Sequence, residues 1–365
     1  MAALTEEQSI LRDQARSWAG SEAPVTAFRA MRDSGVETKF NGDTWQAMVE
    51  LGWTGIVVPE AHGGADLGYL TFGLVLEELA RELVASPLFA SAFVGASAVR
   101  LAGSEAQQAQ WLPGVVDGSQ ILTLAVDEGP HHNPANITST LAGGVLNGTK
   151  SFVLEGMAAT TFVVAALNEA GEQVLAMVPA DAAGVNRQVL HTMDSRGFAT
   201  VSFENVAVEE DATLAKTGQL DLVLDIARAG LGMDMLGTAT RSFDMTLEYL
   251  KTRKQFGKVI GSFQALGHRA AELFGQQELA RSCAEAALHA IDEGSADTAL
   301  LASLSKARTG DFLHEMSNQL IQIHGGIGMT DEYDAGFYLK RARVLETLYG
   351  NQSYHRDRYA KLLEF

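Results

Sequence analysis

Arg253-Lys254-Gln255-Phe256-Gly257 directly follows an apolar segment near 218–251, and no proline occurs after Pro179, so long helices are allowed here. A planar guanidinium is suited to bidentate phosphate contact, and a phenylalanine ring offers a flat apolar face. The same residues also fit a purely structural interpretation, in which the helix dipole favours a basic helix end and Gly257 stops the helix. The motif alone leaves both interpretations open.

A second motif, Gln322-Ile323-His324-Gly325-Gly326-Ile327-Gly328, lies further along the chain. Paired glycines let a backbone approach a ligand closely, and their amides can face an anion. The pattern does not fit a Rossmann fingerprint, because it follows an apparent helix and lacks the Gly-x-Gly-x-x-Gly spacing. Its alternative interpretation is a simple turn between two helices.

Around these motifs the last part of the chain reads as helical. Apolar, helix-favouring stretches occur near 218–251, 262–292, 297–323 and 331–348. Their apolar faces need partners, so we expect a C-terminal helical bundle over residues 214–365 that forms an oligomer interface.

The middle of the chain, residues 120–213, reads as a β domain. β-Branched residues are concentrated there and sparse after residue 216, and they favour strands. Short apolar segments at Ile121–Val126, Phe162–Leu167 and Val174–Val178 are separated by turn residues. Val145–Lys150 predicts two strands joined by a tight turn at Asn147-Gly148.

Residues 1–119 are expected to form a helical domain. Thr5 and Gln8 form a capping-box pattern, and helices are expected near Thr44–Leu51 and Tyr69–Val84. The whole chain therefore predicts an α+β protein of three parts, namely residues 1–119, 120–213 and 214–365.

Composition excludes several classes of function. The chain has 27 Lys+Arg against 45 Asp+Glu, a net charge of −18, which makes nucleic acid a poor partner. A single cysteine, Cys283, excludes an internal disulfide framework and a cysteine-rich metal site, and we expect no metal. No apolar run reaches the ~18 residues of a membrane span, and the N-terminus has no basic leader pattern. These features predict a cytoplasmic protein.

The motifs in this order resemble the acyl-CoA dehydrogenase family over nearly the whole chain. The matching stretches are Leu51-Gly52 to Gly55, Pro59-Glu60, Gly63-Gly64, Glu77-Glu78 to Arg81, Leu146 to Lys150, Arg253 to Gly257 with Gln264, and Gln322 to Gly326. The resemblance implies an all-α N-terminal domain, a β-barrel-like middle domain and a C-terminal four-helix bundle. It also implies a non-covalent FAD that oxidises the Cα–Cβ bond of an acyl-CoA thioester in lipid metabolism. An electron-transfer flavoprotein would accept the electrons.

The resemblance further implies which residues bind the cofactor. In this family one FAD is shared across a dimer interface, with the β domain of one subunit holding the flavin ring. The neighbouring subunit holds the pyrophosphate and adenosine. The residues of this chain that match that role are Arg253, Phe256, Phe263, Gln264, Gln322, Ile323, His324, Gly325 and Gly326. Arg228 is expected to bind substrate.

The sequence departs from the family at the catalytic base. The family takes the α-proton with a glutamate, and the ungapped count from Gly325-Gly326 places Tyr349 at that position. Ala227 occupies the alternative base position. A phenol with a pKa of ~10 is almost entirely protonated at neutral pH, so it is a weak base. No catalytic residue is therefore assigned.

The β domain departs as well. Leu154 stands where relatives carry a threonine hydroxyl near flavin N5, and no Gly-Ser-Asp follows Val126–Pro130. The chain thus resembles the base-lacking subunit of a heteromeric enzyme, a heterotetramer with a Glu-bearing homologue. Two alternatives stay open: a homomeric flavoenzyme on an acyl-CoA-like thioester without the usual base, in which Tyr349 acts or other chemistry is used, and a non-catalytic scaffold.

Overall fold

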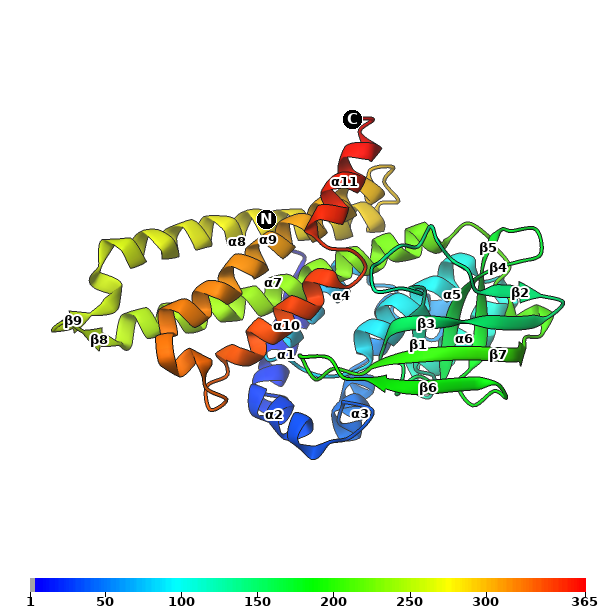
Figure 1. Cartoon of the computed structure of the whole chain (residues 1–365), viewed down its shortest axis with the longest axis horizontal. Helices are drawn as coiled ribbons and strands as arrows, with labels where there is room; N and C mark the ends of the chain where they lie inside the picture. The colour runs from blue at the N-terminus through cyan, green and yellow to red at the C-terminus, as the bar shows by residue number, and fades with distance from the viewer. Residues whose placement is uncertain (1–3) are drawn as a thin grey trace. The chain divides into compact units, whose positions relative to one another are not determined.

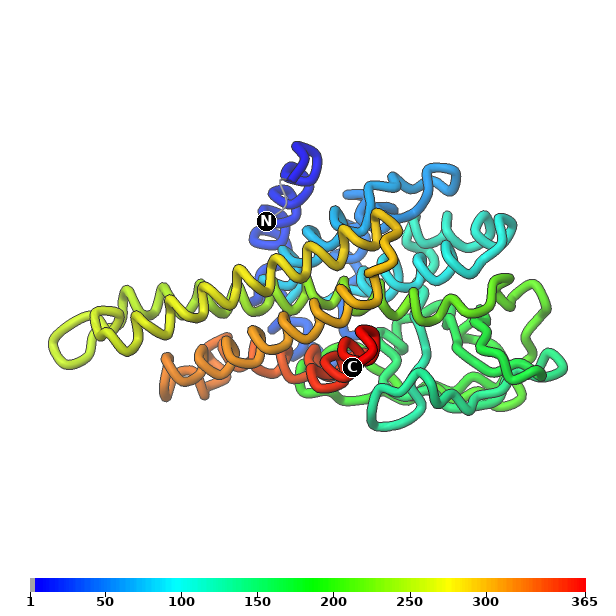
Figure 2. The backbone as a smooth tube through the Cα atoms, turned by 90° about the horizontal axis from the view of Figure 1, so that it is seen from above, coloured from blue at the N-terminus to red at the C-terminus, as the bar shows by residue number. Residues whose placement is uncertain are grey.

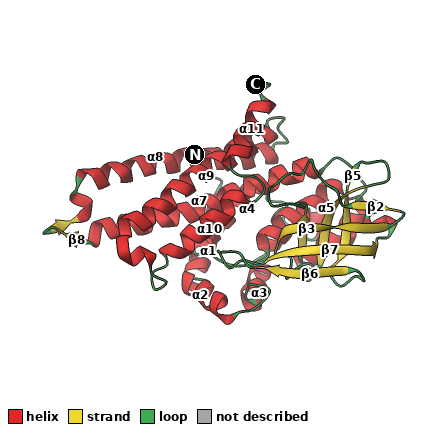
Figure 3. Cartoon of the chain, in the orientation of Figure 1, coloured by secondary structure: helices red, strands yellow, loops and turns green. Residues whose placement is uncertain are grey.

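The computed structural model describes residues 4–365 and has helices at both ends of the sequence and a β-sheet between them (Figures 1 and 3). This order confirms the predicted α+β class. The chain divides into two compact units. The helical unit consists of the chain up to Ala27 with Gly73–Val84 and Arg228–Phe365, and the sheet unit consists of Phe28–Phe72 and Ala85–Ala227. This division into two units does not test the three predicted domains, 1–119, 120–213 and 214–365, which stay predictions.

Long helices make up the helical unit. Its elements are α1 (Glu6–Glu22), most of α4 (Tyr69–Arg81) and of α7 (Leu220–Thr252), and all of α8 (Gln264–Asp292), α9 (Thr298–His324), α10 (Ala335–Thr347) and α11 (Gln352–Leu362). Helix α9 packs against α8, α10 and α11 (Figure 2). The predicted C-terminal helices are confirmed to within a few residues, and the Thr5–Gln8 capping box is present.

Buried acidic residues tie α4 to its neighbours within the helical unit. Glu77 is 3% exposed and accepts two hydrogen bonds from Arg281 of α8, at 2.9 and 2.7 Å. The hydroxyl of Tyr338 on α10 donates to the carbonyl of Arg81 at 2.7 Å. Because a buried charge is tolerated only when it is paired, the Glu77–Arg281 pair fixes how α4 and α8 face each other.

The end of α7 differs from the prediction. Gly257 does not stop a helix, because α7 already ends at Thr252. The chain continues into a small hairpin of β8 (Lys254–Gln255) and β9 (Lys258–Val259). Phe256 and Gly257 form its two-residue turn with φ angles of 52° and 81°. Two positive φ angles are what a tight hairpin turn needs, so Gly257 serves the turn.

The sheet unit combines short helices with a seven-stranded sheet. Its helices are α2 (Val25–Ser34, which begins in the helical unit), α3 (Gly42–Glu50), a π-helical segment Phe89–Gly95, α5 (Ala96–Ala102) and α6 (Glu105–Val116). Its strands are β1 (Leu122–Ala125), β2 (Thr140–Ala142), β3 (Val145–Leu154), β4 (Thr161–Leu167), β5 (Gln173–Pro179), β6 (Val185–Leu190) and β7 (Phe198–Ala207). The strand order is β1-β4-β2-β3-β7-β6, and β5 pairs with β4.

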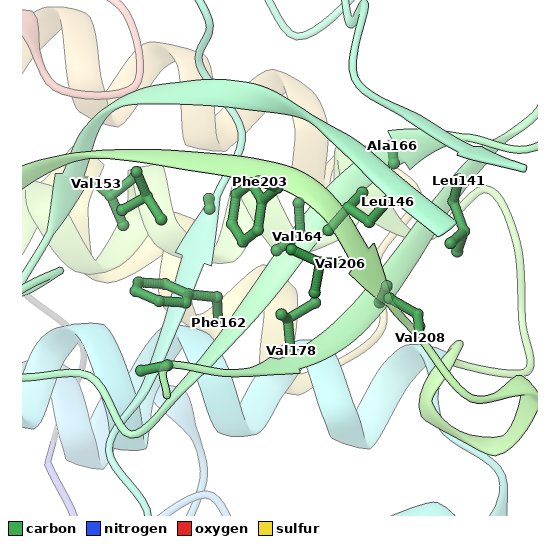
Figure 4. Close-up of a cluster of buried hydrophobic side chains, with 14 of the residues drawn as sticks. Leu141, Leu146, Val153, Phe162, Val164, Ala166, Val178, Phe203, Val206 and Val208 are labelled. Atoms are coloured by element: carbon green, nitrogen blue, oxygen red, sulfur yellow. The ribbon is translucent and has the colours of Figure 1, made fainter. Parts of the chain in front are cut away.

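One apolar cluster forms the core of the sheet (Figure 4). Phe162 of β4 and Phe203 of β7 meet edge to face, with ring centroids 6.0 Å apart. Val164, Val178 and Val206 surround this pair with side chains that are 0–1% exposed. β-Branched and aromatic side chains pack well on a pleated surface, which explains why this stretch forms strands.

The predicted hairpin turn at Asn147-Gly148 is wrong. β3 runs straight through it, and the real turn is Gly143-Gly144, with φ angles of 56° and 73°, between the paired residues Ala142 and Val145. Gly148 instead marks a shift in the pairing of β3 with β7, a bulge where a Cβ would lie 2.0 Å from Ser139 Oγ. Gly143-Gly144 and Gly148 lie close together in the sequence, and the local sequence does not distinguish a glycine in a turn from a glycine in a bulge.

In the described part of the chain, no helix is both long enough and apolar enough to span a bilayer.

Candidate functional site

The two glycine-containing motifs of the C-terminal region lie at the same end of the helical unit. Tyr249, one turn before Arg253 on α7, stacks on His324 at the end of α9, with ring centroids 4.2 Å apart. The Tyr249 hydroxyl also donates to the His324 carbonyl at 3.4 Å. These contacts bring the start of the β8–β9 hairpin close to the Gly325-Gly326 turn. The two motifs can therefore contact one ligand, as was predicted for FAD.

Polar groups at this end are available for a ligand. Arg253, Gln264 and Gln322 are exposed, and within residues 4–365 none of their side chains makes a hydrogen bond or ion pair. Gly325 has a φ of 61°, and a Cβ on either Gly325 or Gly326 would meet no atom within 4 Å. A guanidinium, two amides and an open glycine turn form a suitable set of donors for a diphosphate.

Phe256 presents an apolar ring to solvent at a conformational cost. Its residue is 90% exposed, and its φ of 52° lies in the region that L-residues rarely adopt. The half-buried Phe263 lies edge-on to it, with centroids 6.3 Å apart. The exposed apolar side chains of Ile327 and Met329 follow the glycine turn. An exposed apolar cluster of this kind indicates a surface that a ligand or partner covers.

His324 faces inward, although we predicted it among the cofactor-binding residues. It is 3% exposed, its Nδ1 lies 2.7 Å from the Leu320 carbonyl, and its Nε2 lies 2.9 Å from the Tyr333 hydroxyl. Burial lowers its pKa, so the ring is neutral and donates through Nδ1. The His324 side chain therefore supports the glycine turn from inside. Its neighbour Ile323 is half-buried.

The predicted base position is buried and holds a phenol. Tyr349 is 6% exposed and has a φ of 53°. The nearby carboxylate of Glu346 is bound by His314, at 3.1 Å, and by Arg343. Glu346 is thus committed to structural contacts. Ala227, at the alternative base position, is fully buried within the sheet unit.

Arg228 contacts the main chain of the predicted base position. We predicted it to bind substrate, but it is 1% exposed. Its Nε donates to the Tyr349 carbonyl at 3.3 Å, and its Nη2 donates to the Tyr354 hydroxyl at 3.3 Å. Since the guanidinium is enclosed by protein, its visible role is to support the main chain at residue 349.

Leu154, the position in the sheet unit where a hydroxyl was expected near the flavin ring, is buried. Leu154 is 6% exposed and ends β3, and its carbonyl accepts a hydrogen bond from Thr123 Oγ1. Phe152, two residues earlier, is 43% exposed and has a φ of 52°. Leu154 has no side-chain donor, as the sequence indicated.

Sequence analysis missed two pairs that close the loop after β1. Asp127 binds Nδ1 of His132 through both carboxylate oxygens, at 2.9 and 3.0 Å. Glu128 accepts from the buried Lys150 at 2.6 Å. Burial alone would raise the pKa of Glu128, but hydrogen bonds from Lys150, Thr138 and Ser139 outweigh it and lower the pKa to about 2. In the sequence, only Lys150 hinted at these pairs, because a lysine within an apolar strand needs an acidic partner if it is buried.

Comparison with known proteins places the chain among flavoenzymes. A family model described as acyl-CoA dehydrogenase, N-terminal domain, matches residues 5–119, and one described as acyl-CoA dehydrogenase, C-terminal domain, matches residues 219–363. The acyl-CoA dehydrogenase IpdE2 of Mycobacterium tuberculosis is 30% identical over 92% of this chain and 91% of its own length.

Two solved structures resemble the chain over nearly its full length. One is described as a variant of the Tcur3481-Tcur3483 steroid ACAD, with a TM-score of 0.90 and 29% identity, covering 98% of each chain. The other is the ChsE4-ChsE5 complex from Mycobacterium tuberculosis, with a TM-score of 0.92 and 25% identity, covering 99% of this chain and 98% of that one.

Proposed function

Because this chain belongs to the acyl-CoA dehydrogenase family, we propose that it is the base-lacking subunit of a heteromeric acyl-CoA dehydrogenase. Membership of this family of oxidoreductases indicates FAD as the cofactor. In the proposed complex, this chain holds the diphosphate and adenosine of FAD, and a homologous partner supplies the catalytic glutamate. The reaction is the α,β-desaturation of an acyl-CoA thioester.

One observation carries this proposal: the counted base position holds a buried phenol, and the carboxylate closest to it in sequence is already bound. Tyr349 is 6% exposed, and Glu346 is held by His314 and Arg343. Burial disfavours the charged form of a phenol, so Tyr349 is poorly suited to accept an α-proton. A base from another chain is therefore needed.

The adenosine-diphosphate half of FAD fits the residues of the helical unit. Arg253, Gln264 and Gln322 have exposed side chains without protein partners among the described residues, and Gly325-Gly326 leaves open space for an anion. Phe256 offers an exposed ring beside them. A bound FAD would supply a hydride acceptor for the reaction, and Arg253, Gln264 and Gln322 of this chain would bind and orient its diphosphate end.

The flavin-ring half does not fit as well. Leu154 cannot donate a hydrogen bond, and the Asp127 carboxylate is already occupied by His132. A chain that keeps one half of a shared site and lacks donors in the other suits an assembly of two different subunits. The names of two similar structures, Tcur3481-Tcur3483 and ChsE4-ChsE5, each give two components, which supports a heteromer here.

The other partners follow from the same proposal. The substrate is an acyl-CoA thioester, the electron acceptor is an electron-transfer flavoprotein, and the assembly is a heterotetramer. The exposed apolar side chains Phe256, Ile327 and Met329 provide part of the surface that a second subunit covers.

Co-expression tests the proposal. The chain is purified alone and together with a family homologue that carries the glutamate, and each sample is assayed for absorbance, subunit ratio and turnover of acyl-CoA thioesters with an artificial acceptor. We expect a colourless, inactive chain alone and a yellow, active complex with one flavin per heterodimer. Yellow, active protein from this chain alone would favour the homomeric alternative, and colourless protein with every partner would favour the scaffold.

A further inference from the structure

A fully buried lysine holds the end of α10. Lys306 of α9 is 1% exposed, and its Nζ donates to the main-chain oxygens of Leu345 at 2.9 Å, Glu346 at 3.3 Å and Gly350 at 3.0 Å. In its protonated form the Lys306 side chain has three donor hydrogens, and all three have acceptors here. The acceptors all belong to the short segment that contains the base position.

Two further donors reach the same segment from other helices. The carbonyl of Tyr349 accepts from Nε of Arg228 on α7, at 3.3 Å, and from Nε2 of His355 on α11, at 3.1 Å. His355 is fully buried, and burial together with the nearby Lys306 and Arg228 charges lowers its pKa to about 2. The imidazole is therefore neutral and donates through Nε2.

The segment that these donors hold has an unfavourable backbone. Tyr349 has a φ of 53° and Gly350 a φ of 106°. A left-handed conformation costs a non-glycine residue free energy, and such conformations persist only where the surroundings enforce them. Gly350 cannot carry a side chain either, because a Cβ there would lie 2.8 Å from His355 Nε2.

We propose that Lys306, Arg228 and His355 form a carbonyl clamp that fixes the backbone of Leu348–Gly350 and so sets the direction of the side chain at residue 349. All three are positioning residues. The hydrogen bonds of the clamp are accepted by main-chain oxygens. The clamp can therefore hold the same backbone conformation whether residue 349 is a tyrosine or a glutamate. Arg228 is thereby assigned to this support and not to direct contact with substrate.

This inference deepens the proposed function, because residue 349 is the base position. Its test nevertheless needs neither flavin nor a partner subunit. The full-length chain is compared as wild type, as Lys306→Met and as Lys340→Met. Lys306→Met keeps most of the side-chain volume but removes the donor, and Lys340→Met makes the same change at an exposed site on α10.

Hydrogen exchange reports on the clamp, because the amides of Leu348 and Gly350 donate to the carbonyls of Val344 and Thr347 and exchange when this local structure opens. We expect Lys306→Met to speed exchange in peptides covering 345–352 by about tenfold or more, since lost buried hydrogen bonds favour local opening. Exchange in α8 should stay unchanged, and Lys340→Met should match wild type. Unchanged exchange over 345–352 in folded Lys306→Met, or equal acceleration across the chain, would overturn the clamp.

A second readout follows the side chain itself. In protein labelled with 3-fluorotyrosine, the fluorine signal of Tyr349, assigned by Tyr349→Phe, should shift or broaden in Lys306→Met. The signal of Tyr69, in the sheet unit, should not. If Lys306→Met does not fold, the same exchange experiment is made with His355→Phe. Faster exchange limited to 345–352 would support the clamp, and unchanged exchange would overturn it. Failure of the heteromer would leave these results untouched.

Discussion

Arg228 donates to the main-chain oxygen of Tyr349 over 3.3 Å, across 121 residues of sequence. The arginine that was predicted to bind substrate thus donates a hydrogen bond to the residue at the predicted base position, inside the helical unit. This contact joins a buried arginine, which was predicted to face substrate, to a tyrosine with a φ of 53°. The main chain around the predicted base position is therefore held by hydrogen bonds to its carbonyl oxygens.

Arg253→Ala should remove flavin from the assembled complex without unfolding the chain. The guanidinium is exposed and makes no contact within the described residues, so its loss costs little stability but removes a charged donor for the diphosphate. The flavin-to-protein ratio and the melting temperature check this. Lys251→Ala, an exposed change on the last turn of α7, serves as the control. Unchanged flavin content in the assembled Arg253→Ala complex would refute the assignment.

Phe256→Asn should leave the isolated chain as stable or more stable, while weakening binding of flavin and partner. Asparagine tolerates a φ of 52° better than phenylalanine, and a ring that is 90% exposed contributes little burial. The gain should be at most about 1–2 kcal/mol. Urea unfolding of the isolated chain and flavin content of the complex are the measurements. A clear loss of stability in the isolated chain would show that the ring packs against the protein.

Lys306 should make the stability of the chain depend on pH above neutrality. Burial lowers the pKa of Lys306 to about 7; the charge of Arg228 lowers it further, and the charge of Glu346 partly opposes this. The unfolded side chain keeps a pKa near its ordinary value of 10.5. Between these values the unfolded state binds the extra proton, so the free energy of unfolding rises with pH by up to about 1.4 kcal/mol per unit. His355 also lies nearby but stays neutral over this range.

Urea titrations at pH 7, 8 and 9 on wild type and Lys306→Met test this dependence. The difference in free energy of unfolding between wild type and variant should shift in favour of wild type as pH rises. A difference that is constant with pH would mean that Lys306 keeps its proton throughout.

Glu128 should give the sheet unit a stability that acid removes. Its folded pKa of about 2 lies below its ordinary value of 4.5, so the stabilisation is complete above pH 4.5 and is lost as pH falls through 2. Glu128→Gln should be less stable near neutral pH, because it leaves Lys150 without its ion-pair partner, and should show a weaker loss of stability on acidification. Circular dichroism of acid unfolding checks this, and identical acid profiles would contradict it.

Much of the fold could be predicted from local sequence. The proline-free C-terminal half predicted α7 to α10, and the β-branched middle predicted the sheet, because both signals act over short distances. The turn at Gly143-Gly144 was missed because Asn147-Gly148 gives the same local signal, and its bulge depends on pairing with β7, more than 50 residues further along the chain.

The candidate site was predictable only in part. Arg253, Gln264, Gln322 and the glycine turn stand out as motifs, and the structure leaves them exposed at one end of the helical unit. Lys306 could not be found from sequence, because a lysine on a helix usually faces solvent and its three acceptors lie about 40 residues further along the chain. The inward orientation of His324 likewise depends on Tyr333 and on Tyr249 from another helix.

We propose that this chain needs the glutamate of another subunit. The most direct measurement is turnover of a panel of acyl-CoA thioesters with an artificial electron acceptor, by this chain alone and by its complex with a Glu-bearing homologue. We predict little or no turnover by the chain alone, since general-base catalysis contributes about 10²–10⁴-fold, and clear turnover by the complex. Rapid turnover by the chain alone that Tyr349→Phe abolishes would contradict the account and make Tyr349 the base.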